Sequence, residues 1–128
     1  SMSGTAGYLA PETLEQTGHG RSVDIWAFGI LMFIILVKES PFYSENLSEL
    51  FDMIINEPVE WDWYKDELSP NAKSLLEGLL IKDPEKRLGC GPNGMEEIKN
   101  HPFFQGIDFN DAFDMKLKPI IRPKLTIA

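Results

Sequence analysis

The chain has 128 residues, 43% of them hydrophobic and 25% charged, which excludes a disordered or low-complexity protein. Lys and Arg total 12 and Asp and Glu total 20, and the net charge of −8 argues against a primary role in binding nucleic acid. The single cysteine, Cys90, excludes an intrachain disulfide, and His19 and His101 are too few for a zinc signature. The composition predicts a globular domain with no metal site.

The first half of the chain is dominated by one apolar stretch. Residues 3–12 are punctuated by glycine and proline and predict an ordered loop. Residues 25–37 are uncharged and nearly all apolar, but they are too few to span a membrane. They predict a helix that is buried on all sides, capped at its start by Ser22 or Asp24 and ended by Pro41.

The second half predicts three more helices. The first, over residues 47–56, follows a capping box at Asn46, and the next follows Ser69 and carries an apolar stripe to Leu80. A short helix is expected to begin at a capping box at Asn93 and to end before residue 101. Residues 61–63 predict a short extended stretch, and the chain beyond residue 104 predicts an extended tail. The expected fold is mainly α, with four main helices and no major sheet.

Four segments resemble protein kinases, in the correct order and spacing. Residues 4–12 (GTAGYLAPE) resemble the end of a kinase activation segment, and residues 24–30 (DIWAFGI) resemble the kinase D-x-W-x-x-G segment. Residues 82–89 (KDPEKRLG) and 98–104 (IKNHPFF) resemble the closing segments of the kinase C-lobe. The tail resembles that of the AGC group of serine/threonine kinases, with a calcium/calmodulin-type kinase as the nearest alternative.

The resemblance implies a division of the chain and a role for each part. Residues 1–2 look like an expression scar or start, residues 3–104 like part of a kinase C-lobe, and residues 105–128 like the start of an AGC-type tail. The matching loop in kinases binds substrate, and here it comprises Thr5, Ala6, Gly7, Tyr8 and Leu9. Thr5 is implied to contact the catalytic loop; without the resemblance, a plain turn residue is the preferred interpretation.

The remaining matched residues are implied to be structural. Glu12 and Arg87 match a buried ion pair that ties the activation segment to the helical core, because an arginine fork meets a carboxylate through two hydrogen bonds. Asp24 matches an aspartate that holds the catalytic loop, and it could also serve only as a helix cap. Trp26 belongs to the same segment. None of these residues is expected to be catalytic.

The sequence lacks the groups with which kinases bind nucleotide and transfer phosphate. It contains no G-x-G-x-x-G loop, no V-A-I-K-like strand, no H-R-D and no D-F-G. We therefore expect a fragment that is inactive alone and binds no cofactor, from a parent kinase that uses ATP and magnesium. The alternatives are a stand-alone kinase-like lobe or a pseudokinase that acts as a binding or scaffold module.

Partners and location follow from the same resemblance. The parent is expected to act on protein substrates, and the missing N-lobe and catalytic loop are expected partners of this chain. Without them one flank of residues 25–37 should be exposed, which would favour a homodimer or a swapped tail. The cytoplasm is the default location.

Several residues have ordinary interpretations. Trp61 and Trp63 are expected to pack between helices rather than bind a ligand, and Cys90 to be a loop residue. His101, which precedes a proline, is expected to be a structural cap rather than a catalytic base. The acidic residues between positions 45 and 62 are expected to form a solvated face, although they could attract basic substrates.

Overall fold

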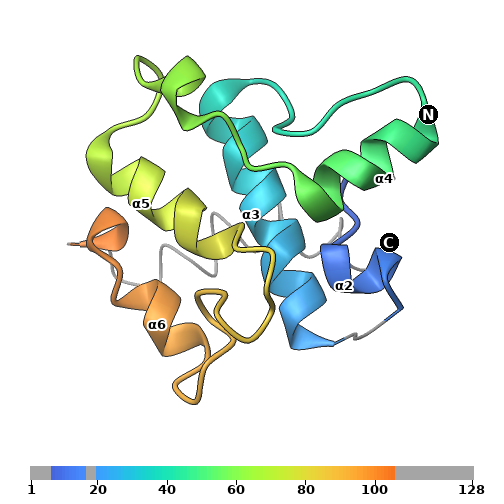
Figure 1. Ribbon diagram of the computed structural model, residues 1–128. Coiled ribbons are helices and arrows are strands. Elements are labelled where there is room, and N and C mark those ends of the chain that lie inside the picture. The colour runs from blue at the N-terminus through green and yellow to red at the C-terminus, as the bar shows by residue number, and fades with distance from the viewer. Residues whose placement is uncertain (1–6, 17–19, 106–128) are drawn as a thin grey trace.

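The computed structural model describes residues 7–16 and 20–105, and the helices of these two ranges surround one long central helix (Figure 1). Within these ranges there is no strand. The elements are α2 (Pro11–Leu14), α3 (Arg21–Val37), α4 (Leu47–Asn56), η1 (Trp61–Tyr64), α5 (Pro70–Leu79), α6 (Met95–Lys99) and η2 (Pro102–Phe104), where η marks a 3-10 helix. The prediction of a mainly α fold is confirmed over the described residues, and the expected tail lies outside them.

Helix α3 forms the centre of the structure. Figure 1 shows it between α5 on one side and α4 and α2 on the other. Trp26, Ile30 and Phe33 are fully buried, as expected for a helix with apolar side chains on every face. Every residue from Ile25 to Val37 is buried or half-buried, so the flank that was expected to be exposed unless the tail or another copy covers it is not exposed in this chain. No described helix is long and apolar enough to cross a membrane.

A glycine allows α3 and α5 to approach closely. A Cβ atom built on Gly29 would lie 2.9 Å from the Cβ of Leu79 and 2.8 Å from the Cδ2 of Leu80. These distances are shorter than van der Waals contact, so a side chain at this position would push α5 away. Gly29 therefore sets the spacing of the two helices that contribute most of the core.

The N-terminal capping residues of α4 and α5 are the predicted ones, whereas those of α3 and α6 are not. The side chain of Asn46 accepts a hydrogen bond from the Glu49 amide at 2.9 Å, and Ser69 caps α5 in the same way. Helix α3, however, begins at Arg21, with Gly20 as its N-cap at a φ of 92°. Asp24 therefore lies inside the first turn, too far along the helix to cap it. Helix α6 likewise starts after Gly94 instead of being capped by Asn93.

The segment around the two tryptophans differs from the prediction. Residues 61–64 form the 3-10 helix η1, closed by a hydrogen bond from the Trp63 amide to the Glu60 carbonyl at 3.1 Å. Because such a helix has about three residues per turn, side chains two positions apart point in different directions. Trp61 packs against Phe33, with 6.0 Å between ring centroids, whereas Trp63 is 74% exposed. The expected packing is therefore found for Trp61 alone.

Candidate functional site

The segment predicted to bind substrate leads directly into α2. Thr5 and Ala6 lie outside the described residues, so their predicted roles are untested. Gly7 is buried, and Tyr8 and Leu9 are half-buried and pack against the hydrophobic core. The next two residues, Ala10 and Pro11, are buried, and the proline takes the first helical position of α2, where its missing N–H costs nothing. This anchoring places Glu12 in the first turn of α2, facing the interior.

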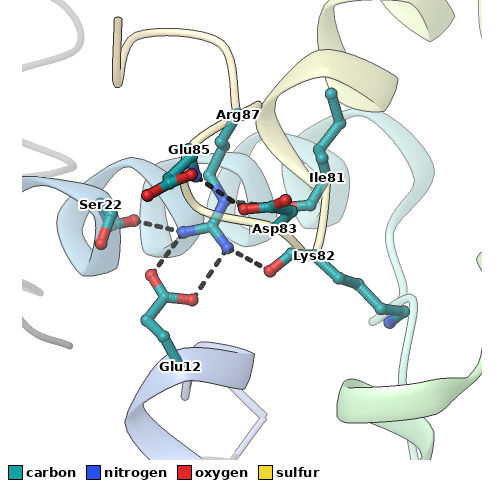
Figure 2. A network of polar contacts seen from close by, with 7 residues as sticks. All are labelled: Glu12, Ser22, Ile81, Lys82, Asp83, Glu85 and Arg87. Atoms are coloured by element: carbon teal, nitrogen blue, oxygen red, sulfur yellow. Dashed lines mark hydrogen bonds and ion pairs between the residues drawn. The ribbon is translucent and has the colours of Figure 1, made fainter. Parts of the chain in front are cut away.

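Glu12 and Arg87 form a buried ion pair between α2 and the loop that follows α5 (Figure 2). The Arg87 Nη1 lies 2.7 Å from the Glu12 Oε2, and the Arg87 Nη2 lies 2.9 Å from the Glu12 Oε1. The Arg87 side chain is 0% exposed and the Glu12 side chain is 2% exposed, so water contributes little to solvating either charge. The structure brings together the two residues, 75 positions apart, that the sequence predicted to pair.

Backbone carbonyls satisfy the remaining donors of Arg87. Its Nε donates to the Ile81 carbonyl at 2.8 Å, and its Nη1 and Nη2 donate to the carbonyls of Ser22 and Lys82 at 2.7 and 3.1 Å. A guanidinium carries five N–H donors, and each of these therefore has an acceptor. Arg87 thus ties three parts of the chain together: α2, the start of α3 and its own loop.

The surroundings of this pair keep it ionised. Burial alone would raise the pKa of the Glu12 carboxyl, but hydrogen bonds from Arg87, from its own backbone and from Ser22, with the attraction of the Arg87 charge, lower that pKa below its usual value. Trp26 covers the guanidinium, whose Cζ lies 5.0 Å from the centroid of the indole ring. Trp26 is itself fully buried, which supports its predicted structural role.

Asp24 does not take part in this network. It lies exposed on the first turn of α3, where a carboxylate interacts favourably with the helix dipole. Its implied role in holding a catalytic loop involves residues that this sequence does not contain, so that role stays a prediction.

The structure shows one half-buried cation that the motifs did not single out. Lys82 lies in the same loop as Arg87, and its Nζ donates a hydrogen bond to the Ile54 carbonyl of α4 at 2.6 Å. The same nitrogen lies 4.5 Å from the ring centroid of Phe42 and 5.7 Å from that of Trp26. Burial is the main reason why the pKa of Lys82 is lowered, to about 8. Its partners lie 28 residues or more away in the sequence, which is why local patterns gave no signal for it.

The other polar residues have structural roles or none. The Nδ1 of His101 accepts a hydrogen bond from the Phe103 amide at 3.0 Å, which confirms that His101 is a cap. Cys90 is half-buried, and burial raises the pKa of its thiol. Among the described residues, no three His, Cys, Asp or Glu side chains are grouped so that they could hold a metal ion. The described contacts of the site join α2, the start of α3 and the loop after α5.

Comparison with known proteins agrees with this geometry. The profile of the protein kinase domain family matches residues 1–104. The chain is 44% identical to RAC-beta serine/threonine-protein kinase A of Xenopus laevis and 43% identical to RAC-beta serine/threonine-protein kinase of Homo sapiens, each over 126 residues and 98% of this chain. The chain belongs to the protein kinase family. It spans about a quarter of the length of these curated relatives, 25% of the first and 26% of the second.

Proposed function

We propose that this chain is part of the helical C-lobe of a serine/threonine protein kinase. The whole protein transfers the γ-phosphoryl group of ATP to Ser or Thr of protein substrates. The buried Glu12–Arg87 pair carries the proposal, because it ties the loop predicted to bind substrate to a helical core. The relatives that match nearly all of this chain are named serine/threonine-protein kinases.

The chain supplies the substrate-binding loop and its support in this proposal. Residues 5–9 form the surface next to the phosphate acceptor, and Thr5 contacts the catalytic loop. The anchoring of Tyr8 and Leu9 on the core supports this role, because a loop that binds substrate needs a rigid base. Residues 3–104 are the partial C-lobe, and residues 105–128 begin the AGC-type tail.

The groups that hold ATP and magnesium belong to other parts of the kinase domain. The sequence has no Gly-rich loop, strand lysine, H-R-D or D-F-G. By this reasoning the 128 residues alone bind no nucleotide and transfer no phosphate. Adding magnesium and ATP to the chain should leave its melting temperature unchanged, and a magnesium-dependent increase would contradict this part of the proposal.

The activity itself is tested on the reading frame expressed with its natural upstream sequence. Phosphate transfer is measured with peptides that differ only in having Ser, Thr or Tyr as acceptor, and transfer to Ser and Thr is expected. Thr5→Ala should reduce this transfer, while Thr5→Ser keeps the hydroxyl and should retain it. A folded protein that transfers no phosphate would favour the pseudokinase or scaffold alternative.

Two further expectations stay predictions. A homodimer or a swapped tail is checked by light scattering of the purified chain, where a single monomeric species would exclude both. The cytoplasmic location expected from the family resemblance is checked by imaging the tagged full-length protein.

A further inference from the structure

The C-terminal turn of α4 lacks one of the hydrogen-bond donors that a helix normally uses. A helical carbonyl accepts from the amide four residues later, and the Met53 carbonyl does so from Glu57 at 2.9 Å. The equivalent donor for the Ile54 carbonyl would be residue 58, which is a proline and has no N–H. Ile54 is fully buried, so its carbonyl needs a donor from elsewhere in the protein.

Lys82 supplies this donor from the loop after α5. Its Nζ lies 2.6 Å from the Ile54 carbonyl oxygen, which is a short hydrogen bond, and 3.4 Å from that of Met53. Figure 2 shows the Lys82 side chain extending away from the Arg87 network, although its own carbonyl belongs to that network. A single residue thus connects the end of α4 to the Glu12–Arg87 junction.

Desolvation is the main effect of the surroundings on the Lys82 amine, and it disfavours the charged form. Phe42 and Trp26 stack nearly in parallel, with an interplanar angle of 9° and 6.0 Å between centroids, and they lie beside the amine without supplying a carboxylate. The pKa of Lys82 is lowered to about 8: burial lowers it most, the charge of Glu57 at the end of α4 acts in the opposite direction, and the charge of Arg87 adds to the lowering. Lys82 therefore has no buried counterion like the one that Arg87 has in Glu12.

We propose that Lys82 is a detachable clamp on α4, which replaces the missing amide of Pro58 and holds the helix end more tightly when its amine has lost a proton. Because α4 also contacts α2, the clamp supports the helix that carries Glu12. The proposal concerns the conformation of α4 and is independent of phosphate transfer.

The direction of the pH effect follows from the two states of the clamp. In the open state the amine is in water and has its ordinary pKa of 10.5, whereas in the closed state its pKa is about 8. Raising the pH through this interval removes the proton from the closed state first, so it favours closure. Between pH 7 and pH 9 the opening equilibrium should fall by about tenfold.

The test is hydrogen exchange of the full chain with millisecond labelling, corrected for intrinsic exchange rates, on the last-turn amides of α4. In the wild type, opening of this turn should fall by about tenfold from pH 7 to pH 9. Lys82→Arg keeps a donor that stays charged, and it should show no such change. At pH 9 Lys82→Met should open at least about fivefold more than the wild type, because it has no donor.

Two controls separate the clamp from general destabilisation. Lys86→Met alters an exposed lysine of the same loop and should reproduce the wild-type pH profile. The amides of α5 report global stability and should keep their protection in Lys82→Arg. The proposal is overturned if Lys82→Arg retains the wild-type pH dependence, or if Lys82→Met leaves exchange at the end of α4 unchanged at pH 9.

Discussion

Arg87 and Lys82 are two cations in one loop, the first buried and the second half-buried, and they differ in their partners. Their charged groups lie 5.0 and 5.7 Å from the same Trp26 ring, and both donate to backbone carbonyls. Arg87 also meets a buried carboxylate through two hydrogen bonds, and all five of its donors have acceptors. Lys82 has two carbonyls and two aromatic rings, and Glu57, the carboxylate whose charge raises its pKa, is exposed.

The difference teaches that contact with an indole ring does not by itself offset the desolvation of a cation, since the pKa of Lys82 is lowered to about 8. The carboxylate does so, since it supplies both an opposite charge and acceptors in the geometry of the guanidinium. The Arg87 site is therefore a permanent connection at any pH near neutral. The Lys82 site holds a group that titrates close to physiological pH.

The largest expected effect comes from breaking the pair at Arg87. Arg87→Met leaves Glu12 charged and buried, and Glu12→Gln leaves Arg87 in the same position, so each should lower the free energy of unfolding by about 3–5 kcal/mol. Urea unfolding followed by circular dichroism measures the loss. The double variant Glu12→Leu with Arg87→Met should lose less than the sum of the two single changes, because no stranded charge remains. Single variants that lose less than about 1 kcal/mol would show that water reaches the pair.

A purely steric change in the core should lower the free energy of unfolding by less than the loss of the ion pair does. Gly29→Ala places a methyl group against Leu79 and Leu80, and it should reduce the free energy of unfolding by about 1–3 kcal/mol. Thermal unfolding by calorimetry measures this change. Glu77→Ala, on an exposed position of α5, should stay within about 0.5 kcal/mol of the wild type. A neutral effect of Gly29→Ala would mean that α5 can move away without loss of packing.

His101 offers a third, smaller test, since burial lowers its pKa as it lowers that of Lys82. Because its Nδ1 accepts from the Phe103 amide, the proton lies on Nε2, which can donate to the Ser74 hydroxyl at 3.0 Å. His101→Ala should lower the free energy of unfolding by about 1 kcal/mol, because the cap is lost.

The pH dependence at this histidine has a definite sign. Burial lowers the pKa of His101 from 6.5 in the folded state, so the unfolded chain binds the proton first as the pH falls. Stability should therefore be fully present above pH 6.5 and decrease below it. Urea unfolding at pH 7 and pH 5 measures this decrease, which should be smaller in His101→Asn. An equal decrease in the variant would assign the effect to carboxylates instead.

The smallest effect is expected for an ion pair on the surface. Lys99 and Glu96 lie three positions apart on α6, with 3.8 Å between Nζ and Oε1, and both are exposed to solvent. Lys99→Ala should change the free energy of unfolding by no more than about 0.5 kcal/mol. A loss comparable to that of Arg87→Met would mean that burial is not what separates the strong pair from the weak one.

The sequence predicted the parts of this structure that depend on local signals or on motifs. The caps at Asn46 and Ser69 and the apolar stripe of α5 are local, and they were correctly placed. The Glu12–Arg87 pair was found only through the resemblance to kinases, since nothing local connects residues 75 positions apart. The acceptors of the other Arg87 donors are backbone carbonyls, which no side-chain pattern reveals.

The failures have equally specific causes. The alternation of Trp61 and Trp63 with charged residues predicted a short extended stretch, but a 3-10 turn separates the two rings and leaves Trp63 exposed. The start of α3 was misplaced because Gly20, at positive φ, is the N-cap, two residues before Ser22 and four before Asp24. Lys82 was missed, although Pro58 gave a signal: a proline four residues after a helical carbonyl leaves that carbonyl without its usual donor.

The wide sequence separation of the Glu12–Arg87 pair has a consequence for how the chain folds. Closing a loop of this length loses conformational entropy before the contact gains anything, whereas contacts within α3 or α5 form at short range. The pair should therefore be absent from the transition state for folding. Its loss should speed unfolding and leave refolding almost unchanged, which stopped-flow chevron plots of Arg87→Met would show. By that reasoning the ion pair determines how long the native state lasts once it has formed.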